Sequence, residues 1–383
     1  MSFGQGFGGI FGRPDDPSGG SDDSGGSSRG YGFSSGSGGA GDDNSNRSEG
    51  SGSRRPGALL LTLIIIGVLV ALFVLFAMVY TEVLWFNQLG YQNVFWIENV
   101  TKGILFVVAG VLMAVVTWLA LHLAYKYRPK NLAGQLRQNV DQYQKQLEPI
   151  RRLVFIGAPI LIGFFAGTAA MNGWEQVLLF FNQVPYGMED PEFGLDLTFY
   201  MATLPLLSTV LSFLTSIVLV AGIAGVIVHY LYGGIRIEDG AGITVERAAR
   251  IHILVFASLY MLLQAGRYWL NRYETLQDQS GNWAGAMYTD VNAVIPTSTI
   301  LAIAALLVIG LFIATMVNGS WRLSIIGVAG FLVAALIAGS IYPFLIQEYR
   351  VSPTEQTMEA PYIERNIEYT REGYNVADVE YTP

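Results

Sequence analysis

A polar stripe crosses one face of the fifth long apolar stretch of the sequence. Its residues are Tyr260, Gln264, Arg267 and Asn271, spaced four, three and four, so they share one face of a helix. An ionisable residue inside a membrane-spanning helix is a candidate for a substrate or ion path, and Arg267 is such a residue. Arg267 also lies within about one turn of the predicted helix end, where its long side chain can reach the membrane surface. The stripe is therefore a polar path or a packing surface, and packing is the simpler interpretation.

Three histidines have the right chemistry for zinc. His122, His229 and His252 all fall near the same ends of their predicted helices, and three imidazoles at one depth can bind a zinc ion. No carboxylate accompanies them in an obvious way, and their spacing is not a local metal motif. We therefore interpret them as amphipathic side chains at the membrane interface.

An acidic loop precedes the fourth apolar stretch. It contains Glu189, Asp190, Glu192 and Asp196, and carboxylates are the ligands that calcium prefers. The spacing does not match a known calcium loop. We expect Asp196 instead to cap the N-terminus of the following helix.

Other catalytic chemistry is missing from the sequence. The central parts of the apolar stretches contain no Asp, Glu or Lys, which argues against a proton-coupled carrier, an aspartyl pair and a Schiff-base lysine. The sequence has no phosphate-binding loop. It also has no Cys, which excludes disulfides, iron–sulfur clusters, thiolate zinc sites and a cysteine nucleophile. We therefore predict no enzyme activity and no cofactor for this chain.

Seven apolar stretches must position these residues. Charged residues make up 14% of the chain, against about 25% in an ordinary soluble protein, and hydrophobic residues make up 52%. Each stretch is close to the roughly 20 residues that a membrane-spanning helix needs, and lipid offers the backbone no other hydrogen-bond partners. The sequence thus predicts an all-α bundle of about seven transmembrane helices, at 57–80, 103–125, 153–171, 204–231, 251–270, 297–317 and 323–342.

Smaller signals refine this bundle. Pro205 suits the first turn of the fourth span. Small residues at four-residue spacing predict close helix contacts in the third span, at Gly163 and Gly167, and in the seventh, at Gly330, Ala334 and Ala338. Apolar residues also recur at helical spacing before the third span and predict an amphipathic helix on the membrane surface or against the bundle. They are Leu132, Leu136, Val140, Tyr143, Leu147 and Ile150.

Lys and Arg predict the orientation. Most of the 22 basic residues precede the first span or lie between spans two and three, four and five, or six and seven, whereas the loop 172–203 has none. By the positive-inside rule the N-terminus is cytoplasmic, and seven crossings put the C-terminus outside. The chain is then a multi-pass membrane protein, and the family resemblance described below implies the bacterial plasma membrane.

The regions outside the spans differ in composition. Residues 1–56 are rich in Gly and Ser and predict a disordered cytoplasmic tail. Residues 57–343 form the transmembrane region. Residues 344–383 are polar, and we expect them to be loosely held apart from a short helix near Tyr362 to Tyr374.

Five short segments carry a family resemblance. They read Trp85-Phe86 with Gly90-Tyr91 and Val94-Phe95; Asp190-Pro191, Phe193-Gly194, Asp196 and Phe199-Tyr200; Tyr230 to Gly234; Tyr288 to Ala293; and Glu359 to Ile367. The combination resembles uncharacterised protein family 0182 (UPF 0182), large bacterial membrane proteins. The resemblance implies a seven-helix N-terminal portion followed by a much larger extracytoplasmic region, of which residues 344–383 would be the start. Because the family has no agreed biochemical function, it supplies no catalytic residues.

Three functions follow from these features. The favoured one is a membrane anchor or assembly subunit that carries a large outer domain for cell-envelope work. The alternatives are a transporter or lipid-handling protein, with the polar stripe and the Ser208, Ser212 and Thr215 face of the fourth span as its path, and an intramembrane enzyme. The expected partners are the lipid bilayer and other envelope or membrane proteins. A net charge of −8 gives no support to a nucleic-acid partner.

Overall fold

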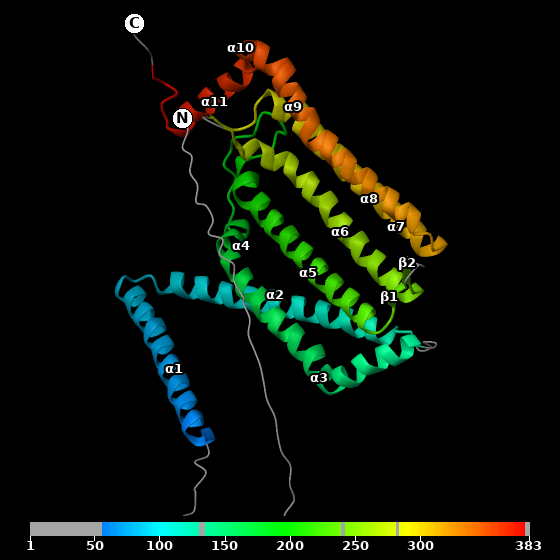
Figure 1. Cartoon of the computed structure of the whole chain (residues 1–383). Coiled ribbons are helices and arrows are strands. Elements are labelled where there is room, and N and C mark those ends of the chain that lie inside the picture. The colour runs from blue at the N-terminus through cyan, green and yellow to red at the C-terminus, as the bar shows by residue number, and fades with distance from the viewer. Residues whose placement is uncertain (1–55, 130–134, 239–241, 281–282, 380–383) are drawn as a thin grey trace, which may run out of the picture. The chain divides into compact units, whose positions relative to one another are not determined.

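The computed structural model describes residues 56–129, 135–238, 242–280 and 283–379 (Figure 1). The predicted disordered tail lies outside these residues. The chain divides into two units, Met1–Leu72 and Phe73–Pro383. In the first unit the described part is the start of helix α1 (Pro56–Gln88), and its large apolar side chains, such as Leu60 and Leu69, are exposed. A helix that is apolar all round suits a lipid environment.

The structure confirms an all-α architecture with seven helices, among the described residues, that are long and apolar enough to cross a membrane. They are α1, α2 (Gln92–Lys126), α3 (Gln135–Ala170), α5 (Leu204–Leu231), α6 (Arg247–Glu274), α7 (Ile295–Asn318) and α8 (Trp321–Leu336) with its continuation. The bounds of α5 agree with the prediction. The helix predicted before the third span is not separate, because α3 runs without a break from Gln135; Leu132 lies outside the described residues.

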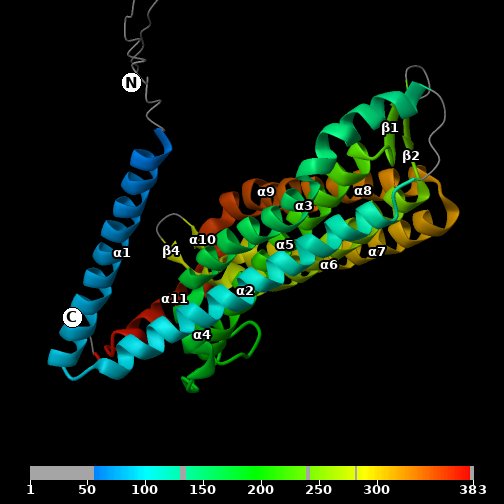
Figure 2. The same ribbon diagram turned by 90° about the horizontal axis from the view of Figure 1, so that it is seen from below.

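The helices of the second unit pack in a different order from the sequence. Neighbouring pairs are α3 with α2, α2 with α5, α5 with α6, α6 with α7, and α7 with α8 (Figure 2). The cluster where α6, α7 and α8 meet includes Leu254, Phe312 and Phe331. Most apolar side chains of the spans remain exposed, as expected where lipid covers the outside of a bundle.

Glycines allow a close contact between α2 and α3. A Cβ on Gly163 would come within 2.5 Å of the Gly110 carbonyl oxygen, and one on Gly167 within 2.6 Å of the Phe106 carbonyl oxygen. The predicted small-residue contact of the third span is therefore confirmed against α2. The prediction for the seventh span is wrong at Gly330, which has no neighbour within 4 Å; Gly327, one turn earlier, faces Leu311 of α7 instead.

Four π-helical turns interrupt the described helices, and each is followed by Pro two residues later. They are η2 (Phe199–Thr203), η4 (Asp290–Val294), η5 (Ile337–Ile341) and η6 (Gln347–Val351), and the prolines are Pro205, Pro296, Pro343 and Pro353. Proline lacks an N–H, and its ring clashes with the carbonyl four residues earlier. A widened turn before the proline relieves this clash, so the helix can continue past it. Pro205 lies in the first turn of α5, as predicted, and η2 directly precedes this helix.

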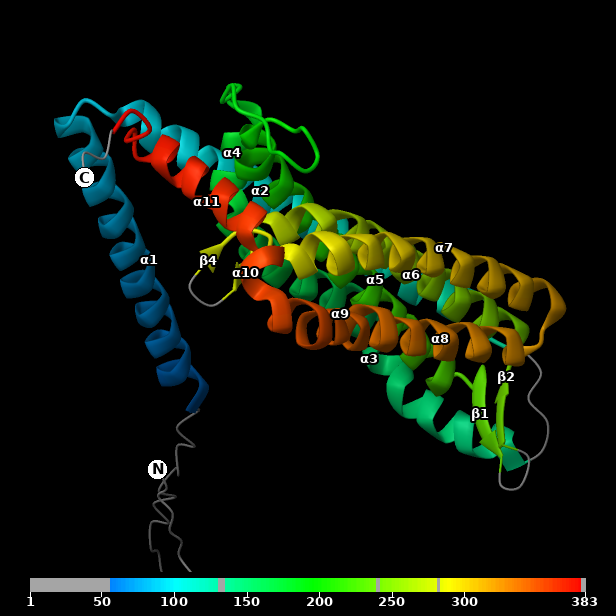
Figure 3. The ribbon, with the colours of Figure 1, turned by 90° about the horizontal axis from the view of Figure 1, so that it is seen from above.

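The two ends of the second unit differ. At one end lie the hairpin of β1 (Ile235–Glu238) and β2 (Gly242–Val245) and the α7–α8 turn, where Arg250 Nη1 donates to the Gly319 carbonyl at 3.2 Å (Figure 3). The other end, here called the cap, holds the remaining short elements. They are η1 (Met171–Gly173), α4 (Trp174–Phe181), η3 (Thr275–Gln277), β3 (Gln279–Ser280), β4 (Trp283–Ala284), α9 (Tyr342–Ile346), η7 (Ser352–Thr354), α10 (Glu355–Met358) and α11 (Ala360–Gly373).

Candidate functional site

The loop before α5 forms one wall of the cap. Asp190 is 6% exposed, and its carboxylate accepts four hydrogen bonds: from the N–H groups of Glu192, Phe193 and Leu195 at 2.7–2.9 Å, and from the Tyr200 hydroxyl at 2.9 Å. Four donors match the lone pairs of one ionised carboxylate. Asp190 is thus a structural centre that ties the loop to the first turns of the next span.

Asp196 organises the other half of the same loop. Its carboxylate accepts the N–H groups of Thr198 at 2.8 Å, Gly187 at 2.9 Å and Tyr186 at 3.0 Å. These hydrogen bonds, that of Thr198 first, hold the pKa of Asp196 well below its ordinary value. The bond to Thr198, two residues on, is the predicted N-terminal cap of the helix.

The C-terminal helix α11 forms the opposite wall. It lies where the sequence predicts a short helix, but side chains tie it to segments far away in the sequence. Glu359 accepts the Tyr288 N–H at 2.9 Å, and the Tyr369 hydroxyl donates to the Glu189 carbonyl at 2.8 Å. Asn366 donates to the Ala284 carbonyl. This helix, which the expectation of a loose C-terminal segment excepted, is therefore held by contacts with distant segments.

Burial changes the titration of this wall. Glu359 is 3% exposed, and burial raises its pKa above the ordinary value, against the lowering effect of the Tyr288 N–H. Burial likewise raises the pKa of Tyr362 and of Tyr369. Both phenols therefore stay protonated at neutral pH and can donate hydrogen bonds.

A cavity of about 330 Å³ lies between the two walls. Its inner lining comes from the ends of three spans and includes Tyr200, Met201, Leu276 and Val291; its outer lining comes from α11 and the loop. The size is at the lower end of the roughly 300–1,000 Å³ of small-molecule sites, which are also mostly apolar with a few polar groups.

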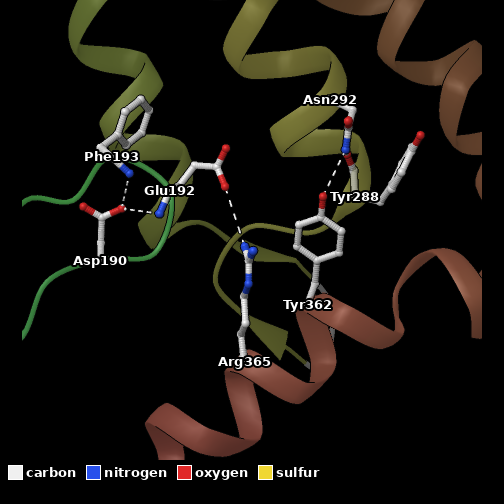
Figure 4. A network of polar contacts seen from close by, with 7 residues as sticks. All are labelled: Asp190, Glu192, Phe193, Tyr288, Asn292, Tyr362 and Arg365. Atoms are coloured by element: carbon white, nitrogen blue, oxygen red, sulfur yellow. Dashed lines mark hydrogen bonds and ion pairs between the residues drawn. The ribbon is translucent and has the colours of Figure 1, made fainter.

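Two of the charged side chains that line this cavity have opposite signs. Glu192, from the loop, and Arg365, from α11, point toward each other with 3.6 Å between Oε2 and Nη1 (Figure 4). Beside them the Tyr362 hydroxyl accepts the side-chain N–H of Asn292 at 3.0 Å. Three of the five segments that carry the family resemblance meet at this cavity, a juxtaposition that their positions in the sequence did not predict.

The structure places the predicted polar stripe between three helices. Arg267 of α6 is exposed and donates to Ser212 Oγ of α5 at 3.0 Å, whereas Asn271 donates to Ser298 Oγ of α7 at 3.0 Å. Tyr260 packs against the cluster of α6, α7 and α8, and Gln264 is half-buried. The stripe thus does not line the cavity.

The histidines do not form one group. His229 and His252 are neighbours with ring centroids 5.1 Å apart, and His229 is buried in the bundle, with 1% of its surface exposed. His122 is exposed and stacks on Trp118 of its own helix. Over the described ranges, no three His, Cys, Asp or Glu side chains are grouped to hold a metal ion.

Comparison with known proteins identifies relatives. The chain is 58% identical over 325 residues to a UPF0182 protein of Micrococcus luteus, covering 85% of this chain and 31% of the relative. It is 49% identical to one of Arthrobacter sp. strain FB24, covering 85% and 32%, and 47% identical to one of Kocuria rhizophila, covering 90% and 35%. The chain therefore spans about a third of the length of these curated relatives. No solved structure matches it. Because the model of the "Uncharacterised protein family (UPF0182)" matches residues 59–383, the chain belongs to that family.

Proposed function

We propose that this chain is the membrane-embedded portion of a cell-envelope protein, and that it anchors and orients an extramembrane region. This proposal is supported mainly by the contacts that hold α11 against the rest of the cap. Its residues and the adjoining Glu359 bind the loop before α5 and, in the connection between α6 and α7, the β3–β4 hairpin and Tyr288, so they contact two connections between spans. A segment held at several points has a fixed direction relative to the bundle, so chain that continues from it in the longer relatives would also be oriented.

The proposed orientation puts the cap outside the cytoplasm of a bacterial cell. Arg128, Arg236, Arg250 and Arg322 belong to connections at the hairpin end, whereas the acidic loop belongs to the cap. This asymmetry supports a cytoplasmic hairpin end under the positive-inside rule. The C-terminus would then lie outside, and the N-terminus in the cytoplasm.

The topology can be tested with alkaline phosphatase, which is active only outside the cytoplasm. A fusion after Thr289, in the cap, should be active, and a fusion after Arg137 should be silent. The reverse pattern would contradict the orientation.

The anchoring role can be tested by hydrogen exchange in the detergent-extracted chain. Amides of α11 should be protected, and Tyr369→Phe, which removes the donor to the Glu189 carbonyl, should speed their exchange without changing the spans. Glu368→Gln, an exposed change in the same helix, is the matched control. Rapid exchange of α11 in the unaltered chain would refute the anchor.

A further inference from the structure

The cavity in the cap lies at the level where the predicted membrane spans end. Tyr200 and Met201 belong to the first residues of one span, Leu276 is next to the last residue of another, and Val291 is the second residue of a third. The opposite lining, on α11, lies beyond the last span. An occupant would therefore have apolar surroundings on one side and polar surroundings on the other.

Met201 connects the cavity to the apolar outside of the bundle. It lines the cavity, yet it is 62% exposed, whereas the adjacent Tyr200 is 6% exposed. Exposed apolar side chains at the edge of a span face lipid when the bundle is in a membrane. A lipid can thus reach the cavity from the side, with its acyl chains remaining against the bundle.

Besides Asp190, the charged side chains that line the cavity are one negative, Glu192, and one positive, Arg365. The Glu192–Arg365 separation of 3.6 Å is longer than the roughly 2.7–2.9 Å of a close charge-assisted hydrogen bond. Their side chains are 28% and 45% exposed, so both can accept another partner. Asp190 also lines the cavity, but its carboxylate already accepts four hydrogen bonds.

One neutral donor adds to this pair. The Tyr362 hydroxyl accepts a hydrogen bond from Asn292, which leaves its own proton for an acceptor in the cavity. Arg365 and Tyr362 together suit a phosphate, and Glu192 suits an ammonium group. A ligand of net negative charge would leave Glu192 facing it without compensation.

We propose that this cavity binds the headgroup of a zwitterionic phospholipid. The phosphate binds Arg365 and Tyr362, the ammonium group binds Glu192, and the acyl chains leave past Met201. This inference does not depend on the anchoring role, since a bundle without an attached domain would bind the same lipid.

The test is native mass spectrometry of the purified 383-residue chain with phosphatidylethanolamine, phosphatidylglycerol or free phosphoethanolamine. We expect retention of phosphatidylethanolamine over phosphatidylglycerol by roughly tenfold, the size of one charge-assisted contact. Arg365→Gln should weaken phosphatidylethanolamine binding by a similar factor. Glu192→Gln should abolish the preference for phosphatidylethanolamine, because the ammonium group then loses its carboxylate partner.

Two changes in α11 away from the cavity are matched controls: Arg371→Gln, at a half-buried position, for the loss of a positive charge, and Glu368→Gln, at an exposed position, for the loss of a negative one. Both should keep the original preference, and the melting temperature of every variant shows whether it is folded. Equal retention of the two lipids by the unaltered chain would overturn the proposal. So would an unchanged preference in a folded Glu192→Gln variant, or free phosphoethanolamine bound as tightly as the lipid.

Discussion

Replacing Asp190 with Asn should loosen the loop before α5 while leaving the spans in place. An Asn oxygen in the position of Oδ1 can still accept the Glu192 and Phe193 N–H groups, but without charge assistance, at a cost of about 1 kcal/mol each. The new NH₂ group would face the Leu195 N–H, donor against donor, which costs about 2 kcal/mol more. The Tyr200 hydroxyl can rotate and accept instead. The expected local cost is therefore about 4 kcal/mol.

Two measurements would detect this cost. Limited proteolysis of the purified chain should cut the loop 182–198 much faster in Asp190→Asn, and hydrogen exchange should rise at Glu192, Phe193 and Leu195. Glu189→Gln is the matched control, because it makes the same chemical change at the exposed neighbouring position. Equal cleavage rates in Asp190→Asn and the unaltered chain would refute the role that we assign to this carboxylate.

Three further changes test other parts of the structure. Gly163→Ala should destabilise the α2–α3 contact by about 1–3 kcal/mol, whereas Gly330→Ala, with open space around it, should be neutral or stabilising; equal melting temperatures would contradict this contrast. Glu359→Gln keeps an oxygen for the Tyr288 N–H. Because burial raises the pKa of Glu359, the folded state of the unaltered chain binds its proton more tightly and loses stability as pH rises above about 4.5, so the variant should gain relative stability from pH 4 to pH 7. Melting curves that keep a constant difference over this range would exclude the effect. Arg267→Gln should lower stability by no more than about 1 kcal/mol if the stripe only packs; loss of a measurable substrate flux in a folded variant would instead support a path.

The spans could be predicted from sequence because lipid leaves the backbone few alternatives. Each long apolar stretch must be a helix. The ends of α5 could therefore be predicted, because the apolar stretch begins at Leu204 and ends at Leu231. Helix length was less predictable, since α3 extends through a polar segment that lipid does not constrain. The sequence contains a partial signal for the π turns, because each π turn among the described residues ends two residues before a Pro. The signal is not sufficient, since Pro159 lies in α3 and no π turn precedes it.

The cap could not be predicted from spacing, because its contacts join residues far apart in the chain. The Tyr369 hydroxyl and the Glu189 carbonyl are 180 positions apart, and Glu359 and Tyr288 are 71 apart. Periodicity reports only local geometry, so it identified α11 as a helix but not the surface that it covers. The acidic residues of the loop show the same limit: their types suggest calcium, whereas the folded loop saturates Asp190 with its own N–H groups.

The π turns and the cap have a common physical origin. A Pro stands two residues after η2 and after η4, and these widened turns are also where Met201 and Val291 line the cavity. If these turns were regular α-helix, every side chain of the turn would be rotated by about 100° around the helix axis relative to the rest of the span. The widened turns therefore set how Met201 and Val291 are directed relative to the spans, and both side chains belong to the cavity lining. On this argument Pro205→Ala should let η2 relax toward a regular helix and change lipid retention in the cavity, although Pro205 itself does not line it.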